Sequence, residues 1–387
     1  MKEIGSKLNF IVLFIVVLII LFGNNPYEIS ESKELLLDSG DTAWMIVSCA
    51  FVLLMTPGLA FFYGGMVNIK NIISTMLQSF VALGVISVVW VLVGFSLAFG
   101  DSLYGIIGNP TTYFNFQNVT LSPHPDFGPT IPFLLFAFFQ LKFAIITPAI
   151  ISGSFAERIR FRSYILFMLL FTIFIYSPLA HMTWHPDGVF RKWGVLDFAG
   201  GTVVHMSAGL AALSGAIFLG KRKKIEEKPA NIPFVILGTG LLWFGWFGFN
   251  SGSALGANFD AAIAFANTNL ASATCMITWI FYDRFTNKKM SAIGACIGAI
   301  VGLVAITPAA GFVTLGQSVF IGFIAAIISN IAIRLTKMTK IDDTLDVFPS
   351  HGVGGIVGMI LTAVFANEVG LIHGHTETLF YHLLAIV

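Results

Sequence analysis

Charge is scarce in this sequence. Only 11% of the 387 residues are charged, whereas 56% are hydrophobic and the mean hydropathy is +0.86. Soluble domains have about 25% charged residues, so this composition excludes a soluble chain and indicates a polytopic membrane protein. The formal net charge is +1, which provides no field that would attract nucleic acid or another polyanion.

Cysteine is also scarce. Cys49, Cys275 and Cys296 lie in apolar segments and have neither the spacing of a metal site nor that of a disulfide framework. We interpret them as packing residues and expect no metal and no cofactor. The sequence has no nucleophile and base at a workable spacing and no phosphate-binding loop after a strand, so we expect no enzymatic activity.

Residues 1–30 have the features of a leader. Lys2 and Lys7 precede an apolar run over residues 9–22, and a polar stretch follows it. This pattern is typical of a signal peptide. No A-x-A cleavage site follows the run, so an uncleaved anchor is the alternative.

Long apolar runs fill the rest of the chain. A helix needs about 20 apolar residues to cross a bilayer. Hydropathy predicts spans near residues 43–66, 72–99, 130–152, 163–182, 199–220, 232–250, 258–282, 291–307, 315–334 and 350–366. The last segment, 376–387, would rise only about 18 Å as a helix, against a hydrocarbon core of about 30 Å. It is either a truncated eleventh helix or a helix that does not cross. The predicted fold class is therefore an all-α polytopic membrane protein with ten to eleven transmembrane helices.

Lysine and arginine occur at alternate connections between the spans. The basic connections contain Lys70, Arg158 to Arg162, Lys221 to Lys224, Arg284 to Lys289 and Arg334 to Lys340. Connections 100–129, 251–257, 308–314 and 367–375 contain neither residue type, and Arg191 and Lys192 are the exception on that side. Because cytoplasmic loops carry the excess of basic residues, this alternation predicts that the mature N-terminus lies outside the cell.

The fifth and tenth spans begin in the same way. Segment 197–211 has an acidic residue, then His205, then small residues, and segment 346–359 has the same order around His351. With five spans in each half, the copies must be inverted, and inverted repeats share a site near the midplane. Ionisable groups at bilayer depth are costly and usually face a pathway. We therefore expect His205 and His351 to meet in one pore; two separately buried packing histidines are the alternative.

Acidic residues are absent from the middle of the predicted spans. Asp197, Asp260 and Asp346 all lie near span ends. A sodium-coupled carrier or a proton pump usually has a carboxylate within the membrane, so these classes are disfavoured.

The middle of the predicted membrane spans contains aromatic residues instead of acidic ones. They are Phe139, Phe143, Trp243, Phe244, Trp246, Phe247 and Phe249. Each alone is most often a packing residue, but with two imidazoles they suit a narrow, dry conduit. Transfer of a small ion into low dielectric costs several kcal/mol, so such a conduit favours a neutral polar solute. Tryptophan faces at its mouth attract a cation by about 0.5 to 2 kcal/mol.

The motifs assembled here resemble those of the ammonium transporter family (Amt/MEP, with the Rh proteins as distant relatives). The likeness covers residues 43–366. Its motifs are TPGLAFFYGGMV at 56–67, FAERIRF at 155–161, LAHMTW at 179–184, DFAGGTVVHMSAG at 197–209, GWFGFNSGS at 245–253 and DDTLDVFPSHGVGGIVG at 342–358. Residues 43–387 are accordingly interpreted as one ammonium transporter domain.

The resemblance implies a role for each matching residue. Trp184, Phe143 and Ser253 match the outer site that recruits ammonium, and Phe143 and Phe249 match the stacked pair that gates the pore. The remaining matches are His205, His351 and Trp246 in the pore wall, Asp197 as structural support of the outer site, and Asp342, Asp343 and Asp346 as structural residues near the inner mouth. We expect ammonium to lose a proton before the gate and ammonia to pass the histidines. A relay of the separated proton by the imidazoles is one mechanism, and simple gas conduction is the alternative that the sequence leaves open.

The resemblance also implies an assembly and a location. The expected fold has eleven helices around one pore per subunit, assembled as a homotrimer in the lipid of the cell (inner) membrane. The resemblance also implies a PII-type regulator as a possible partner. Such a regulator uses a cytoplasmic tail of the family, and without that tail we expect no support for this partner. An ammonium-sensing receptor that signals to a downstream partner or fused domain is the alternative function, and a Rh-like gas channel is disfavoured by Trp184.

Three residues depart from the family pattern. Lys142 precedes the gate residue Phe143 where a small or apolar residue is expected, and snorkelling or pairing on the side away from the pore is the simpler interpretation. His185 and Pro186 follow Trp184 where glycines are frequent, which affects the shape of the outer mouth.

Overall fold

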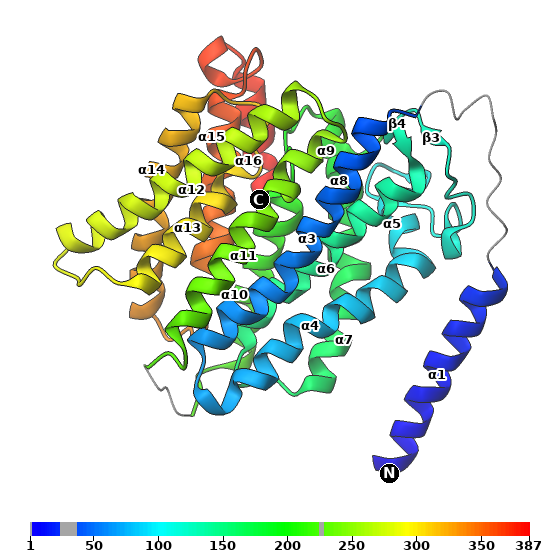
Figure 1. Cartoon of the computed structure of the whole chain (residues 1–387), viewed down its shortest axis with the longest axis horizontal. Coiled ribbons are helices and arrows are strands. Elements are labelled where there is room, and N and C mark those ends of the chain that lie inside the picture. The colour runs from blue at the N-terminus through cyan, green and yellow to red at the C-terminus, as the bar shows by residue number, and fades with distance from the viewer. Residues whose placement is uncertain (1, 24–36, 224–227) are drawn as a thin grey trace.

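The protein is a bundle of long, mostly apolar helices (Figure 1). The computed structural model describes residues 2–23, 37–223 and 228–387. Within these residues, each of the ten predicted spans corresponds to a helix or to a continuous helical rod. Eight of the described helices are long and apolar enough to cross a membrane. The other two spans are α12 (Phe259–Phe285), which is more polar, and α13 (Ala292–Ile306), which is shorter.

The first half of the bundle contains five spans. They are α3 (Ser39–Met66), the rod of α4 (Ile72–Val89), η2 (Trp90–Gly94) and α5 (Phe95–Phe99), then α6 (Phe133–Phe155), the rod of α7 (Phe161–Phe171), η4 (Thr172–Tyr176) and α8 (Ser177–Trp184), and the rod of η5 (Gly201–Met206) and α10 (Ser207–Leu219). The predicted boundaries differ from these by a few residues.

The second half of the bundle also contains five spans. Its spans are α11 (Ile232–Ser251), α12, α13, α14 (Leu315–Met338), and the rod of η7 (Phe348–Val353) and α15 (Gly354–Phe365). The segment predicted as a short eleventh helix forms α16 (Thr376–Ile386), which packs against α15. α1 (Lys2–Gly23) lies apart from the bundle in Figure 1, and the Asn115 amide donates a hydrogen bond to the Ile19 carbonyl at 3.1 Å.

Four of the rods contain a π-helical turn. These turns are η2, η4, η5 and η7. A π-helical turn inside an α-helix is rare and often occurs at a functional site. η5 and η7 begin the fifth and tenth spans, and they carry His205 and His351. The two histidines therefore lie in equivalent local structures, as the inverted repeat predicts.

The two halves meet through equivalent spans. The first span of one half, α3, packs along the first span of the other, α11, and the rod of η5 and α10 crosses η7. At that crossing a Cβ on Gly209 would lie 2.2 Å from the Cα of Gly352. Only a glycine permits this backbone contact. The crossing thus fixes the histidine-bearing turns against each other.

Short strands and one short helix lie in the connections at the upper end of the bundle in Figure 1. β1 (Ser102–Leu103) pairs with β2 (Ile107–Gly108), and β3 (Pro123–His124) pairs with β4 (Gly128–Pro132), both antiparallel. α9 (Val189–Lys192) lies in the connection after α8. This end carries few lysine or arginine residues, so it is the predicted outer end.

A buried ion-pair cluster joins three connections at the opposite end. The Arg222 guanidinium lies 2.9 Å from the Asp342 carboxylate and 3.0 Å from that of Glu157. Burial acts to raise the pKa of both acids, but hydrogen bonds from Arg222 and, for Glu157, from Asn68 and Asn71 hold each pKa below its ordinary value. The cluster ties the ends of α6, α10 and α14 together, so the acidic residue Asp342 is structural here.

Candidate functional site

A cavity of about 300 Å³ opens at the predicted outer end and brings the predicted recruitment residues together. Phe143, Trp184, Asp197 and Ser253 all line it, although they come from four separate segments. The Trp184 ring packs edge-on against the Phe143 ring, with centroids 6.0 Å apart and an interplanar angle of 84°. Gln140, which the sequence did not single out, also lines this cavity.

The polar groups of this cavity have fixed orientations. The Trp184 Nε1–H donates to the Asp197 carbonyl at 3.0 Å, and the Ser253 hydroxyl donates to the Phe249 carbonyl at 2.9 Å. Because Ser253 donates its proton to the backbone, its oxygen lone pairs are left as acceptors. The cavity therefore offers a π face and a hydroxyl acceptor, which together suit a small cation that can donate hydrogen bonds.

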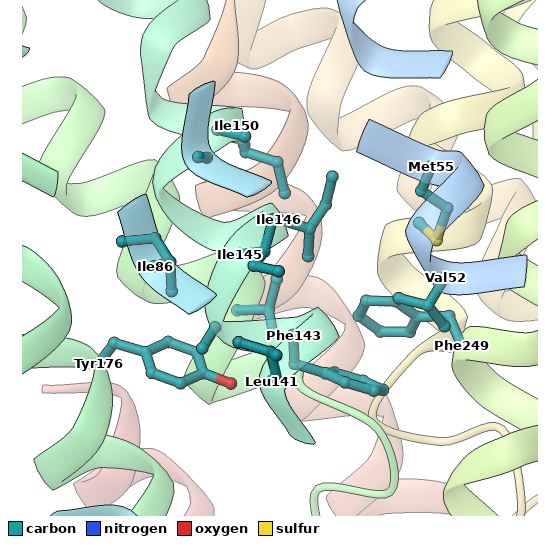
Figure 2. Packing of buried hydrophobic residues seen from close by; sticks show 14 of the residues in the cluster. Val52, Met55, Ile86, Leu141, Phe143, Ile145, Ile146, Ile150, Tyr176 and Phe249 are labelled. Carbon is teal, nitrogen blue, oxygen red and sulfur yellow. The ribbon is translucent and has the colours of Figure 1, made fainter. Parts of the chain in front are cut away.

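Two phenylalanine rings close the inner side of the cavity. The centroids of Phe143 and Phe249 lie 4.3 Å apart at an interplanar angle of 40°, and both side chains are buried. Figure 2 shows the two rings beside each other, between α6 and the α3 residues Val52 and Met55. Phe143 lines the outer cavity and Phe249 lines the next chamber, so this pair separates the two spaces.

The two predicted pore histidines lie in that chamber. The Nδ1 atoms of His205 and His351 are 3.2 Å apart, and both side chains are buried. Since a hydrogen bond needs one donor and one acceptor, one of the two nitrogens carries a proton and the other does not. The Nε2 atom of His205 has no hydrogen-bond partner among the described residues.

Aromatic packing holds the histidine pair in place. The His205 ring stacks on Trp246 with centroids 5.3 Å apart and on Phe249 with centroids 5.9 Å apart. The Trp246 Nε1–H donates to the Thr307 hydroxyl at 2.9 Å, which fixes the indole. Thr307 was not predicted, because no motif marks a hydroxyl whose partner lies 61 residues away.

The chamber itself is small and apolar. Besides the histidines and aromatics, its lining consists of aliphatic side chains such as Met55, Ile146 and Ile150, and its volume is about 10 Å³. A space of about this size holds one water-sized molecule. A larger cavity of about 570 Å³, lined by Asp342, Asp343 and Asp346 among others, lies at the opposite end.

Comparison with known proteins agrees with this arrangement. Residues 43–387 match the model of the Ammonium Transporter Family. The chain belongs to the ammonium transporter family. An ammonium transporter of Aquifex aeolicus is 46% identical to this chain, and the alignment covers 97% of this chain and 88% of the relative. An ammonium transporter of Bacillus subtilis is also 46% identical, and that alignment covers 90% of this chain and 87% of the relative.

Solved structures extend the likeness to the fold. The crystal structure of Saccharomyces cerevisiae Mep2 has a TM-score of 0.85 at 36% identity, covering 91% of this chain and 82% of that one. A structure described as a sensor Amt protein has a TM-score of 0.83 at 33% identity, and the match covers 90% of this chain and 88% of that one. Ammonium transport is therefore the function that the family and these relatives support for this multi-pass membrane protein.

In this transporter Asp197 caps the turn that carries His205. Its carboxylate accepts hydrogen bonds from the backbone N–H groups of Gly200, Gly201 and Thr202 at 2.7, 2.6 and 2.7 Å. The first N–H groups of a helix have no partner within it, so the carboxylate satisfies donors that are otherwise lost. Gly200 has a φ of +130°, which a residue with a Cβ rarely adopts. Asp197 thus holds the turn that carries His205 through its carboxylate, and it holds the Trp184 indole through its carbonyl.

The equivalent residue in the second half is Asp343, not Asp346. Asp343 accepts a hydrogen bond from the Phe348 N–H at 2.7 Å, five residues on, as Asp197 does from Thr202. The matching order of segments 197–211 and 346–359 predicts that Asp346, the acid nearest His351, is the equivalent of Asp197, and that prediction is wrong. Asp346 instead lies 3.3 Å from the Lys337 ammonium. Asp343 precedes His351 by the eight residues that separate Asp197 from His205, and this spacing was the available signal.

Asp343→Asn should change how the stability of the transporter depends on pH. Burial raises the pKa of Asp343 from 3.8 to about 6, against the opposing hydrogen bond from Phe348. Between about pH 4 and pH 6 the folded protein keeps this proton and the unfolded chain loses it, so stability falls as pH rises through that window. A pKa difference of one between the folded and unfolded states corresponds to 1.36 kcal/mol, so above pH 6 the free energy of unfolding is lower by about 3 kcal/mol.

The measurement is the thermal midpoint of purified protein between pH 4 and pH 7. Asparagine has no proton to lose, so the midpoint of Asp343→Asn relative to the wild type should rise across this range. Parallel curves for the two proteins would contradict the assigned burial effect.

The residues that depart from the family pattern lie outside the pore. The Lys142 Nζ is 5.7 Å from the centroid of the Phe138 ring, and the Phe138 side chain is 39% exposed. His185 lines a separate outer cavity of about 700 Å³ and stacks on His181 with centroids 4.3 Å apart. Pro186 lines the same cavity. None of these three residues lines the chamber that holds His205 and His351.

Proposed function

We propose that this transporter recruits ammonium at Trp184, Phe143 and Ser253 and removes a proton before the Phe143–Phe249 gate. Neutral ammonia then passes His205 and His351. The observation that carries this proposal is the sequence of spaces: a 300 Å³ cavity with a π face and a hydroxyl acceptor leads, past a closed aromatic pair, to a dry chamber of about 10 Å³.

The energetic argument concerns the charge of the solute. The chamber is too small to hold an ion together with a hydration shell, and bare ammonium would pay a desolvation cost of several kcal/mol. Ammonia has the same heavy atom without the charge and needs only hydrogen-bond partners. The Nε2 atom of His205, which has no protein partner in the described structure, provides one.

The histidine pair supports a relay of the separated proton. The 3.2 Å Nδ1–Nδ1 contact holds one proton between two imidazoles, and each ring can accept a proton at one nitrogen and release it from the other. Net transport would then carry one positive charge for each ammonia. Conduction of ammonia gas without a proton is the simpler variant of this mechanism.

The proposal includes an orientation and an assembly. The basic connections at the Arg222 end face the cytoplasm, so the Trp184 cavity faces outward in the cell (inner) membrane and the mature N-terminus lies outside. The subunit assembles as a homotrimer with one pore in each copy.

The test is a transport measurement on proteoliposomes that contain the purified chain. An ammonium concentration jump on a solid-supported membrane should give a transient current, whereas an equal potassium jump should give none. A pH dye inside the vesicles provides the second readout. Alkalinisation faster than in protein-free vesicles, without current, would support gas conduction and exclude the relay. Absence of both the current and the faster alkalinisation would exclude transport.

An ammonium-sensing receptor is the second candidate function, because one similar solved structure is described as a sensor Amt protein. A sensor binds ammonium at the outer cavity and conducts little. Quenching of tryptophan fluorescence by ammonium, without current or alkalinisation, would favour this function over transport.

A further inference from the structure

His382 is a fully buried histidine on α16, outside the pore. Its Nδ1 lies 3.0 Å from the Met359 carbonyl, which can only accept, and its Nε2 accepts a hydrogen bond from the Leu196 N–H at 2.9 Å. These partners fix a neutral imidazole with the proton on Nδ1. Leu196 immediately precedes Asp197, so His382 holds the backbone next to the residue that supports the outer site.

The contacts of His382 belong to a closed ring. From Leu196 the ring passes along the chain to Asp197, whose carboxylate accepts from the Thr202 N–H at 2.7 Å. The Thr202 hydroxyl donates to the Met359 sulfur at 3.3 Å, and the Met359 carbonyl accepts from His382. Every member is positioned by its two neighbours, and His382 is the only member on α16.

This ring meets the predicted recruitment site at Asp197. The carbonyl of Asp197 accepts the Trp184 Nε1–H at 3.0 Å, so any displacement of this peptide also moves the indole. A tryptophan face attracts a cation only over a limited range of position, and a small shift weakens the contact.

We propose that His382 is a positioning residue for the outer site, and that its bond to the Leu196 N–H keeps the Asp197 peptide, and through it Trp184, in the geometry that binds ammonium. His382 does not touch the solute. The inference deepens the proposed function and rests on the recruitment role of Trp184.

Other contacts also hold α16 in place, and the experiment must separate their effect on the outer site from the effect of the His382 hydrogen bond. The Trp193 and Tyr381 rings stack with centroids 5.8 Å apart, and the Thr378 hydroxyl donates to the Val369 carbonyl at 2.6 Å. The Thr378 bond also holds α16 in place, but none of its atoms belongs to the ring. Thr378→Val is therefore a matched control that removes a buried hydrogen bond from the same helix.

Two amide substitutions separate the two bonds of His382. The amide of asparagine occupies the Nδ1 edge of an imidazole, so His382→Asn retains the donor to Met359 and loses the acceptor for Leu196. The longer glutamine places its oxygen near the Nε2 position, so His382→Gln retains the Leu196 bond. Both variants keep a polar side chain tied to one partner, which favours folding.

The experiment measures the ammonium concentration for half-maximal current (KM) and the maximal current in proteoliposomes. His382→Asn should raise KM by about fivefold to tenfold, the size expected when a buried donor loses its acceptor, with a maximal current within about twofold of wild type. His382→Gln and Thr378→Val should keep the wild-type KM. Equal KM values in the Asn and Gln variants, or an equal rise in Thr378→Val, would overturn the proposal.

Hydrogen exchange of the peptide covering residues 193–200 provides a readout that does not require transport. Exchange should be faster in His382→Asn than in wild type and unchanged in Thr378→Val, because only the first variant frees the Leu196 N–H. Unchanged exchange in His382→Asn would also overturn the proposal. If the wild-type protein gave neither current nor alkalinisation, the proposed transport function would be contradicted. That outcome differs from the KM and exchange results that would contradict the role of His382.

Discussion

A His205→Leu/His351→Leu variant should lose the ammonium-dependent current, while vesicles that contain it should alkalinise faster than protein-free vesicles in an ammonia gradient. Leucine is similar in volume to histidine, so the chamber stays closed to water and passable to a neutral solute. It cannot hold a proton, so the relay is removed. We expect the current to fall by about a hundredfold, the lower end of what a positioned proton-transfer group contributes.

The measurement is the transient current and the internal pH of the same proteoliposomes. His373→Leu is the matched control, because His373 is an exposed histidine on η8 (Leu371–His373), away from the pore lining. It should leave both signals unchanged. A folded double variant with the full current would show that the histidines carry no proton. Loss of both signals would show that they are needed for passage of the solute itself.

Asp197→Ala should have the largest effect on stability. The substitution leaves the N–H groups of Gly200, Gly201 and Thr202 buried without an acceptor. Each unsatisfied buried donor costs about 1 to 3 kcal/mol, and the sum approaches the whole stability of a typical domain, about 5 to 15 kcal/mol. We expect no folded protein, measured as loss of the monodisperse peak in size-exclusion chromatography of the detergent extract.

Asp197→Asn separates a structural role from a proton-carrying role. The asparagine oxygen still accepts from one or two of the three N–H groups, so the protein should fold with a lower thermal midpoint. An amide cannot carry a proton. If Asp197 is only a support, Asp197→Asn keeps an ammonium current within about tenfold of wild type, a factor worth about 1.4 kcal/mol. Complete loss of current in the folded variant would identify Asp197 as part of the proton path.

Much of the site could be predicted because its physical signals are local in the sequence. A long apolar run predicts a span, and an ionisable residue within it predicts a pathway, so His205 and His351 stood out without a structure. The residues that the sequence did not reveal act through contacts between distant segments. Thr307 anchors Trp246 and His382 anchors Leu196, and neither pair has any spacing rule.

Asp346 was predicted to be the equivalent of Asp197 because the order of residue types is the same in both segments, but the geometry of the helix cap selects Asp343. The order acid, histidine and small residues recurs in both halves, but the nearest acid to His351 is not the one that caps its helix. A capping carboxylate must reach the N–H groups of the first turn, which fixes its distance from the histidine in that turn. Counting eight residues back from each histidine therefore identifies Asp197 and Asp343 together.

The glycine contact between the two halves has a kinetic consequence. At the crossing of the fifth and tenth spans, Gly209 and Gly352 touch through their backbones, with no side chain between them to repack. Transporters that alternate access rock one repeat against the other, and such domain motions take microseconds to milliseconds. Here the two repeats touch through their backbones beside the histidines. In the proposed mechanism we therefore expect the rings of Phe143 and Phe249 to move, and turnover to follow side-chain rotation, as in a channel, and not the reorientation of a domain.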